Sequence, residues 1–287
     1  MRIARFAAPE GPRFAQADPT TPPGGELRWL DLGLATPELQ AALLLGRGPT
    51  PGVELWPALP LLAPVVPTRI FAAGFNYRAL LKERGEPVPK QPVIFVKLNS
   101  ALAAPDAAIS MPREHLEAID YEGELAAVVG TPGRRIPAAE ALAHVAGYTV
   151  ANDLTARDAQ AATRQNTLAK SLPGFAPLGP HLLTADEVAD PQALVIETKV
   201  DGVRRQRGRT KDMVFSVARL ISYISEFVAL ETGDVIETGT PAGLGWLRKP
   251  PATLRPGQLV EVSIAPLGTL ANRLQVEGDG RTAAAPS

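Results

Sequence analysis

The sequence predicts an α+β fold that is rich in mixed β-sheet. From Arg69 onward, short apolar runs with many Val, Ile and Phe residues alternate with turns that contain Gly and Pro, which is typical of strands joined by tight connections. Apolar residues recur at helical steps of three and four in two main segments, residues 138–147 and 215–230. The regular strand and helix alternation of a doubly wound fold is absent. We therefore expect sheets with few helices.

Three regions follow one another along the chain. Residues 1–65 are predicted to form a small N-terminal accessory domain, with a strand at the start and a helix in residues 36–46 that Thr36 caps. Residues 66–275 are predicted to form the main domain, and residues 276–287 a frayed tail. The strands expected in the main domain are RIFAAGFNY, PVIFVKLNS, GELAAVVG, VAGYTVAND, ALVIETKVDG, GDVIETGTPAG and GQLVEVSIAPLG.

The overall composition excludes several classes of function. A formal net charge of -1 over 287 residues argues against a nucleic-acid or anionic-membrane partner. Cysteine is absent, which excludes disulfides, thiolate metal sites and a cysteine nucleophile. The first residues lack the apolar core of a signal peptide, and charged residues interrupt each candidate membrane span. We expect a cytoplasmic protein with no nucleic-acid or membrane partner.

Three carboxylates stand at alternate positions in the segment DYEGELAAVVG. If this segment is one extended strand, Asp120, Glu122 and Glu124 point to the same face. A buried cluster of carboxylates is costly unless it is solvated, protonated or neutralised by a cation. A hard divalent ion such as Mg²⁺ would neutralise it, because this ion prefers oxygen ligands. The alternative is the solvated face of an edge strand, since exposed acidic residues are common.

A second polar group follows the next expected strand. The segment GYTVANDLTARDAQ breaks after its apolar run at Asn152, and then contains Asp153, Arg157, Asp158 and Gln160. Strand ends commonly carry functional residues. Asp153 is therefore a candidate third carboxylate for the same cluster.

Together with GFNY, AKSLPGFAPLGP, the segment from residue 201 to 225 and GDVIETGTPAGLG, these motifs resemble the fumarylacetoacetate hydrolase family in sequence and in order. The resemblance covers about residues 69 to 270. It implies a mixed β-roll or β-sandwich fold, a homodimer, and one Mg²⁺ or Mn²⁺ ion held by Glu122, Glu124 and Asp153. Asp120 precedes the family motif, so we expect it outside the ligand set, either behind the ligands or solvated.

The resemblance also assigns residues that contact substrate. Lys170 would contact a substrate carboxylate or carbonyl, or move a proton if its pKa is lowered. Thr240, in the turn GTPAGLG, corresponds to a threonine at the carboxylate end of the substrate. Arg157 and Gln160 are carried over as polar groups on the substrate side, although Arg157 could instead pair with Asp158.

One position departs from the family pattern. Many members carry a histidine three residues before a glutamate, and the two residues activate a water. The segment GFNYRALLKERG keeps Glu83 but has Leu80 at the histidine position. His115, His144 and His181 offer no obvious substitute, and we expect structural or surface roles for them.

The missing histidine favours enolate chemistry over hydrolysis. A metal that chelates a 2-oxo or 1,3-dicarbonyl acid polarises the carbonyl and stabilises the enolate, whereas hydrolysis of a carbon–carbon bond also needs a deprotonated water. We therefore predict a Mg²⁺- or Mn²⁺-dependent isomerase, tautomerase or decarboxylase of a small acid of this kind. Two alternatives remain open: a carbon–carbon hydrolase of the acylpyruvase or fumarylacetoacetase type, served by metal-bound water or Glu83 alone, and a catalytically silent scaffold.

Overall fold

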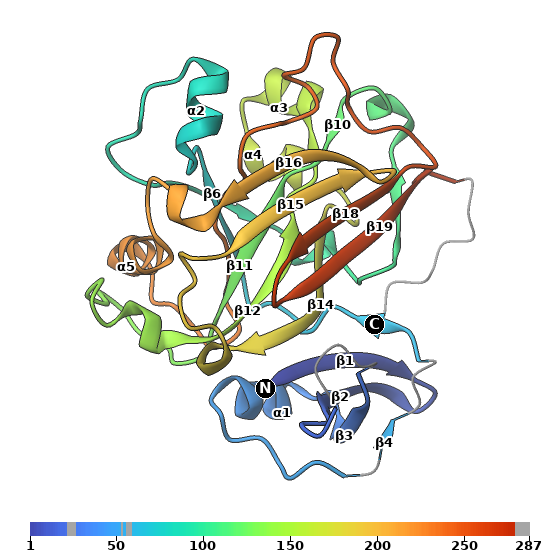
Figure 1. The fold of residues 1–287 in the computed structure, drawn as a ribbon, viewed down its shortest axis with the longest axis vertical. Coiled ribbons are helices and arrows are strands. Elements are labelled where there is room, and N and C mark those ends of the chain that lie inside the picture. The colour runs from blue at the N-terminus through green and yellow to red at the C-terminus, as the bar shows by residue number, and fades with distance from the viewer. Residues whose placement is uncertain (22–26, 53, 56–58, 279–287) are drawn as a thin grey trace.

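The structure is a computed structural model that describes residues 1–21, 27–52, 54–55 and 59–278 (Figure 1). The strands within these ranges are β1 (Arg2–Ala8), β2 (Gly11–Ala17), β3 (Trp29–Leu34), β4 (Glu54–Leu55), β5 (Leu61–Leu62), β6 (Ile70–Gly74), β7 (Val93–Lys97), β8 (Leu102–Ala103), β9 (Ala108–Met111), β10 (Ile119–Asp120), β11 (Gly123–Val129), β12 (Val145–Asn152), β13 (Thr155–Ala156), β14 (Ala176–Thr184), β15 (Val195–Val200), β16 (Val203–Arg209), β17 (Val235–Glu237), β18 (Leu259–Ile264) and β19 (Gly268–Val276). The α-helices are α1 (Pro37–Leu44), α2 (Arg78–Arg84), α3 (Arg157–Thr163), α4 (Asn166–Lys170) and α5 (Val217–Phe227).

Two large mixed sheets form the molecule. In the part of the chain that the structure describes, a 12-stranded sheet runs in the order β4-β3-β2-β1-β14-β12-β11-β17-β6-β7, with β5 beside β1 and β8 beside β14. A five-stranded sheet runs in the order β16-β15-β18-β19-β9, and β10 pairs with β13. In Figure 1 the smaller sheet lies across the face of β11, β12 and β14. The predicted α+β fold with mixed sheets and few helices is confirmed.

The main core fills the space between these two sheets. It contains alternate residues of β11, namely Leu125, Ala127 and Val129, together with apolar side chains of β12, β15, β18 and α5. The intervening residues Ala126 and Val128 belong to a second core on the opposite face of β11. Because side chains alternate along a strand, Glu124 shares the face of this second core.

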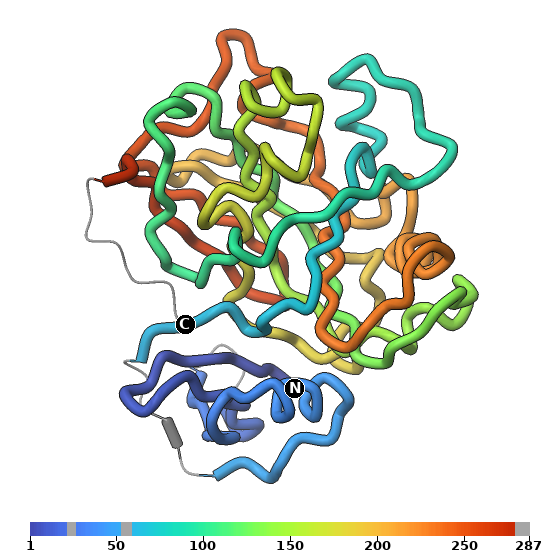
Figure 2. Tube along the Cα trace, turned by 180° about the vertical axis from the view of Figure 1, so that it is seen from behind, coloured from blue at the N-terminus to red at the C-terminus, as the bar shows by residue number. Residues whose placement is uncertain are grey.

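The N-terminal region continues the main sheet. β1 pairs antiparallel with β14, so that Arg2 lies opposite Leu183. The predicted helix is α1, and the Thr36 hydroxyl accepts a hydrogen bond from Leu39 N at 3.2 Å, as expected of an N-cap. Figure 2 shows this region gathered at one end of the main domain. The division at residue 65 stays a prediction.

Two local predictions are wrong. Residues 138–147 do not form an α-helix: a single 3-10 turn, Ala141–His144, precedes β12. The reason is that Val145–Asn152 form an interior strand between β11 and β14 in which all but one residue are buried. The segment from Asp120 is also not one continuous strand, since β10 ends at Asp120 and β11 begins at Gly123. The seven predicted strands and the helix in residues 215–230 are confirmed.

Two expectations concern the ends of the chain and membranes. Most of the predicted frayed tail, residues 279–287, lies outside the described residues. No helix in the described ranges is both long and apolar enough to cross a membrane.

Candidate metal and substrate site

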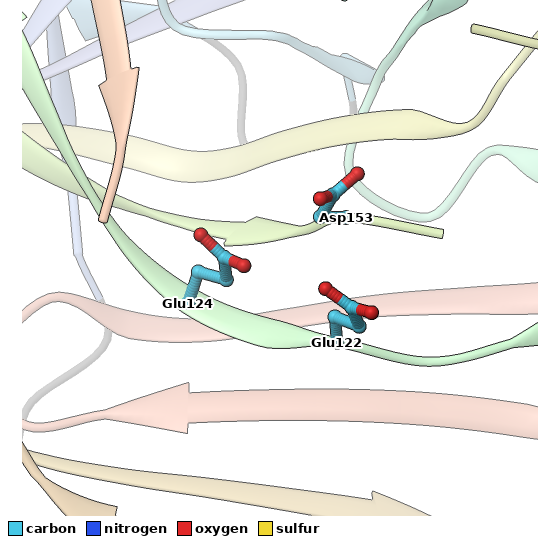
Figure 3. A group of neighbouring side chains, drawn as sticks. All are labelled: Glu122, Glu124 and Asp153. Carbon is cyan, nitrogen blue, oxygen red and sulfur yellow. The ribbon is translucent and has the colours of Figure 1, made fainter. Parts of the chain in front are cut away.

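Glu122, Glu124 and Asp153 come together where β11 begins and β12 ends (Figure 3). Gly123 pairs with Asn152, and Asp153 N donates to Glu122 O at 2.8 Å, so the ladder continues past both strands. One ligand oxygen from each of the three side chains lies within 4.8 Å of the others, and all three residues are buried. Because β11 is an interior strand, the alternative of a solvated edge-strand face is wrong.

Asp120 contacts residues that surround the site and does not face water. It is fully buried, and its carboxylate accepts hydrogen bonds from Gly245 N at 2.9 Å and from Arg157 Nη2 at 3.1 Å. The break between β10 and β11 separates it from the carboxylate trio. Its exclusion from the predicted ligand set agrees with this position, and the prediction that it could be solvated is wrong.

Two predicted cations contact the carboxylates. Lys170 Nζ, at the end of α4, donates to Glu122 Oε2 at 3.0 Å and to Asp153 Oδ2 at 2.6 Å. It also donates to the Thr155 hydroxyl at 2.8 Å. Arg157 Nη2, at the start of α3, donates to Glu122 Oε1 at 2.5 Å. Arg157 therefore pairs with Asp120 and Glu122, and the alternative pairing with Asp158 is wrong.

Lys97 and Glu237 are further charged members of the site that the sequence analysis missed. Lys97 Nζ, at the end of β7, donates to Asp153 Oδ1 at 2.5 Å and to Phe175 O at 2.8 Å. Glu237, at the end of β17, lies 3.6 Å from Lys97 Nζ, and neither of its carboxylate oxygens has a hydrogen-bond partner among the described residues. Both side chains are fully buried. The available signal was a charge within each apolar strand segment, VIFVK and DVIET.

Burial and neighbouring charges shift the pKa values of this cluster in opposite directions. Burial, followed by the charge of Asp153, raises the pKa of Glu124 well above its ordinary value. Burial raises the pKa of Glu237 to about 7. Burial would also raise the pKa of Asp153, but Lys170 and Lys97 lower it. For Lys170, Asp153 and Glu122 outweigh the effect of burial and raise the pKa, so its ammonium keeps its proton.

The charge balance of the cluster fits a divalent cation. Five buried carboxylates face two buried lysines and the partly buried Arg157; the carboxylates are Asp120, Glu122, Glu124, Asp153 and Glu237, and the lysines are Lys97 and Lys170. The excess of two negative charges is the charge that one Mg²⁺ or Mn²⁺ would cancel. The carboxylate oxygens of the trio are the ligands that such hard ions prefer. Without an ion, the raised pKa values of Glu124 and Glu237 indicate that protons would offset the excess.

The loop after β17 fixes Glu124 and Thr240. Gly239 has a φ of +95°, and its backbone N donates to Glu124 Oε2 at 2.6 Å. A Cβ at Gly239 would lie 2.8 Å from the Asn76 Cβ, so the close approach and the backbone conformation both favour glycine. The Thr240 hydroxyl donates to Gly123 O at 3.0 Å and accepts from Gln206 Nε2 at 2.8 Å.

A narrow cavity opens beside these residues. Its volume is about 70 Å³, and its walls include Glu122, Arg157, Gln160, Lys170 and Thr240. The predicted substrate residues Arg157, Gln160 and Thr240 thus share one cavity with Lys170. Their contacts to a substrate stay predictions.

The residues at the predicted water-activating positions do not meet in this cavity. Leu80, in α2, lies in the cavity wall. Glu83 is exposed on the same helix, and its Oε2 accepts a hydrogen bond from Gly243 N at 2.9 Å. This contact connects α2 to the loop after β17. A catalytic role for Glu83 stays a prediction, and this geometry gives it no direct support.

None of the three histidines lines the cavity among the described residues. His115 Nδ1 lies 2.9 Å from Asp158 Oδ2 near the surface, and His144 Nδ1 lies 2.8 Å from Thr131 O. His181 is buried, and burial lowers its pKa to about 4. These positions agree with the structural and surface roles expected for them.

Comparisons with known proteins agree on one family. The model of the fumarylacetoacetate (FAA) hydrolase C-terminal family matches residues 69–275. The chain is 40% identical over 294 residues to the mitochondrial oxaloacetate tautomerase FAHD2B of Homo sapiens, covering 96% of this chain and 91% of that protein. A similar match, 40% over 293 residues with the same coverage, is found to the mitochondrial oxaloacetate tautomerase FAHD2A of Homo sapiens.

Solved structures support the same relationship. The 2-hydroxyhepta-2,4-diene-1,7-dioate isomerase from Mycobacterium marinum superposes with a TM-score of 0.81 at 33% identity, covering 97% of this chain and 99% of that chain. The 5-carboxymethyl-2-hydroxymuconate delta-isomerase from Mycobacterium smegmatis gives a TM-score of 0.82 at 33% identity, with 96% and 100% coverage. The family match over most of the chain and these full-length similarities show that the chain belongs to the fumarylacetoacetate hydrolase family.

Proposed function

We propose that this chain is a Mg²⁺- or Mn²⁺-dependent enzyme that tautomerises or isomerises a small 2-oxo or 1,3-dicarbonyl acid, with decarboxylation as a related outcome. The observation that carries the proposal is the position of Lys170. Its ammonium bridges Glu122 and Asp153 inside a buried carboxylate cluster that has an excess of two negative charges. Relatives named as oxaloacetate tautomerases and as a 2-hydroxyhepta-2,4-diene-1,7-dioate isomerase support the reaction class.

Glu122, Glu124 and Asp153 would hold the metal ion. When bound, this ion supplies Lewis-acid polarisation of a carbonyl oxygen. Lys170, which keeps its proton, stabilises the negative charge that develops on a substrate oxygen while the C3 proton passes to a water molecule. Arg157 and Gln160 orient the substrate at the cavity wall, where Arg157 Nη1 donates to Gln160 Oε1 at 3.1 Å.

The cavity offers little support for water activation. Leu80 is an apolar wall residue, and Phe95 lies beside Lys170, with the ammonium 5.4 Å from the ring centroid. Apolar walls exclude bulk water and strengthen the charge interactions inside. A carbon–carbon hydrolase remains the second candidate, because a fumarylacetoacetate hydrolase from Exiguobacterium antarcticum superposes with a TM-score of 0.82 at 34% identity.

The test measures by NMR the rate at which the C3 protons of oxaloacetate exchange with deuterated water. We expect the wild-type enzyme with Mg²⁺ to exceed the rate of Mg²⁺ alone, and Lys170→Met to lose at least about 10²-fold of this enhancement, the lower range for removing a group that stabilises a developing oxyanion. Lys199→Met, which removes a half-exposed surface ammonium, is the matched control and should exchange like wild type. Equal rates for wild type and Lys170→Met would reject the proposed role.

Two further properties are proposed with the function. We expect a homodimer, and we expect a cytoplasmic location. Both human relatives reported above are named as mitochondrial proteins, so the compartment of this chain stays a prediction.

A further inference from the structure

A second cavity adjoins the inner one. It measures about 580 Å³, whereas the inner cavity measures about 70 Å³. The residues that line both are Phe75, Arg84, Arg157, Gln160 and Asn166. Because the inner cavity is the smaller of the two and contains Lys170 and Glu122 in its wall, it would hold the reacting end of a substrate. The remainder of a longer substrate would lie in the outer cavity.

Arg84 is the charged residue at the junction of the two cavities that the proposed chemistry does not use. It is the last residue of α2, and its side chain is 21% exposed. The guanidinium lies 4.9 Å from the ring centroid of Phe75 and 5.3 Å from that of Trp246. Stacking between two rings limits the directions in which the guanidinium can move. Arg84 is therefore a fixed positive group in the cavity wall.

No carboxylate of the described residues binds Arg84 closely. The one ion pair recorded for it is with Glu86, at 3.9 Å, which is too long for a hydrogen bond. Arg84 Nε and Trp246 Nε1 are both buried and have no hydrogen-bond partner in the described part of the chain. Buried donors of this kind normally have an acceptor. Where the two cavities meet, the guanidinium of Arg84 and the N–H group of Trp246 thus lack an anionic partner among the described residues.

The surrounding charges also favour an anion at this position. Burial, followed by the charge of Arg157, lowers the pKa of Arg84. Arg164 lines the outer cavity as a further cation. The acidic side chain in that wall, Asp158, lies beside His115, and its Oδ1 accepts from Ala159 N. A bound carboxylate would relieve the repulsion between Arg84 and Arg157.

We propose that Arg84, stacked between Phe75 and Trp246, binds the distal carboxylate of the substrate, so that the enzyme selects 2-oxo dicarboxylic acids over 2-oxo monocarboxylic acids. This inference rests on the proposed function, because the reacting end of the same molecule must occupy the inner cavity. Arg84 is a specificity residue: it contacts the end of the substrate that does not react. Its loss changes which acid binds, while the charged cluster around Lys170 stays intact.

The test is calorimetric titration of the full-length protein with Mg²⁺. The ligands are 2-oxoglutarate, 2-oxoadipate and 2-oxopimelate, each against the monoacid of the same chain length. We expect wild type to bind at least one diacid about tenfold to a hundredfold more tightly than its monoacid, the range for a charge-assisted hydrogen bond. In Arg84→Met this preference should fall to near one, with monoacid affinity unchanged.

Two variants separate selectivity from folding. Arg78→Met removes an exposed arginine from the same helix and should keep the wild-type preference. Arg84→Lys keeps the charge and should retain part of the preference, whereas a purely structural role would change diacid and monoacid affinity together. Equal binding of diacids and monoacids by wild type, with C3 exchange intact, overturns the role of Arg84 alone. If no 2-oxo acid binds wild type and no exchange occurs, the proposed function fails, and this inference fails with it.

Discussion

Replacing Lys170 with Met should destabilise the metal-free protein strongly. The ammonium is almost fully buried and donates three hydrogen bonds, to Glu122, Asp153 and Thr155. Removing one partner of a buried ion pair typically costs about 3–5 kcal/mol, because the opposite charge stays buried without compensation. We expect a loss in this range for the free energy of unfolding of Lys170→Met in EDTA at neutral pH.

The assay is urea denaturation of wild type, Lys170→Met and Lys199→Met. The Lys199 side chain is 43% exposed and lies 3.5 Å from Glu197, and a surface pair of this kind contributes about 0–1 kcal/mol. The control variant should therefore unfold within about 1 kcal/mol of wild type. A loss in Lys170→Met that is no larger than that of Lys199→Met would refute the account of the buried charge cluster.

The loss of unfolding free energy in Lys170→Met should become smaller at low pH. The pKa of Asp153 is lowered in the folded chain, so its carboxylate stabilises the fold above its unfolded pKa of about 3.9. That contribution is lost as the pH falls through the lowered folded pKa. The difference between wild type and Lys170→Met should therefore shrink in acid. A difference that grows as the pH falls would contradict the assigned charges.

Three further predictions follow from other parts of the molecule. Burial lowers the pKa of His181 from 6.5 to about 4, so the neutral imidazole stabilises the fold above pH 6.5. Between pH 6.5 and pH 4, the free energy of unfolding of wild type should fall by about 3 kcal/mol more than that of His181→Leu. Urea denaturation measures both, and an equal fall in the two proteins would contradict this prediction. Light scattering should give about twice the chain mass of 30.3 kDa, whereas a monomer would reject the homodimer. In Leu80→His, the rate of hydrolysis of an acylpyruvate should rise by about 10²-fold if the missing base alone limits it. This rise should require Glu83. No rise would show that the base is not the limiting factor.

Strand alternation and the family motifs together predicted the carboxylate trio, and the motif match is what left Asp120 out. Glu122 and Glu124 are two residues apart, and Asp153 follows the next strand, so local periodicity and the order of motifs placed them together. Lys97 and Glu237 could not be found in this way. They meet because β7 and β17 both pair with β6 in one sheet, although 140 residues separate them in sequence. Sequence periodicity indicates which face a residue occupies, but long-range strand pairing decides what it contacts.

Two other features depend on tertiary contacts. The segment 138–147 shows helical spacing, but burial of Val145 and the following residues in β12 outweighs it, as tertiary contacts often outweigh weak local preference. Asp120 was expected outside the ligand set, yet its role in holding Arg157 depends on the break between β10 and β11 and on the loop at Gly245. The sequence contains no periodic signal for either feature.

We propose above that the buried carboxylate trio binds one divalent ion. The most direct test of this proposal is a titration of EDTA-treated protein with Mn²⁺, in which electron paramagnetic resonance measures the free ion. We expect one tightly bound Mn²⁺ per chain that Mg²⁺ displaces, and loss of this binding in Glu122→Ala. Undiminished Mn²⁺ binding in Glu122→Ala, or no binding by wild type, would contradict it.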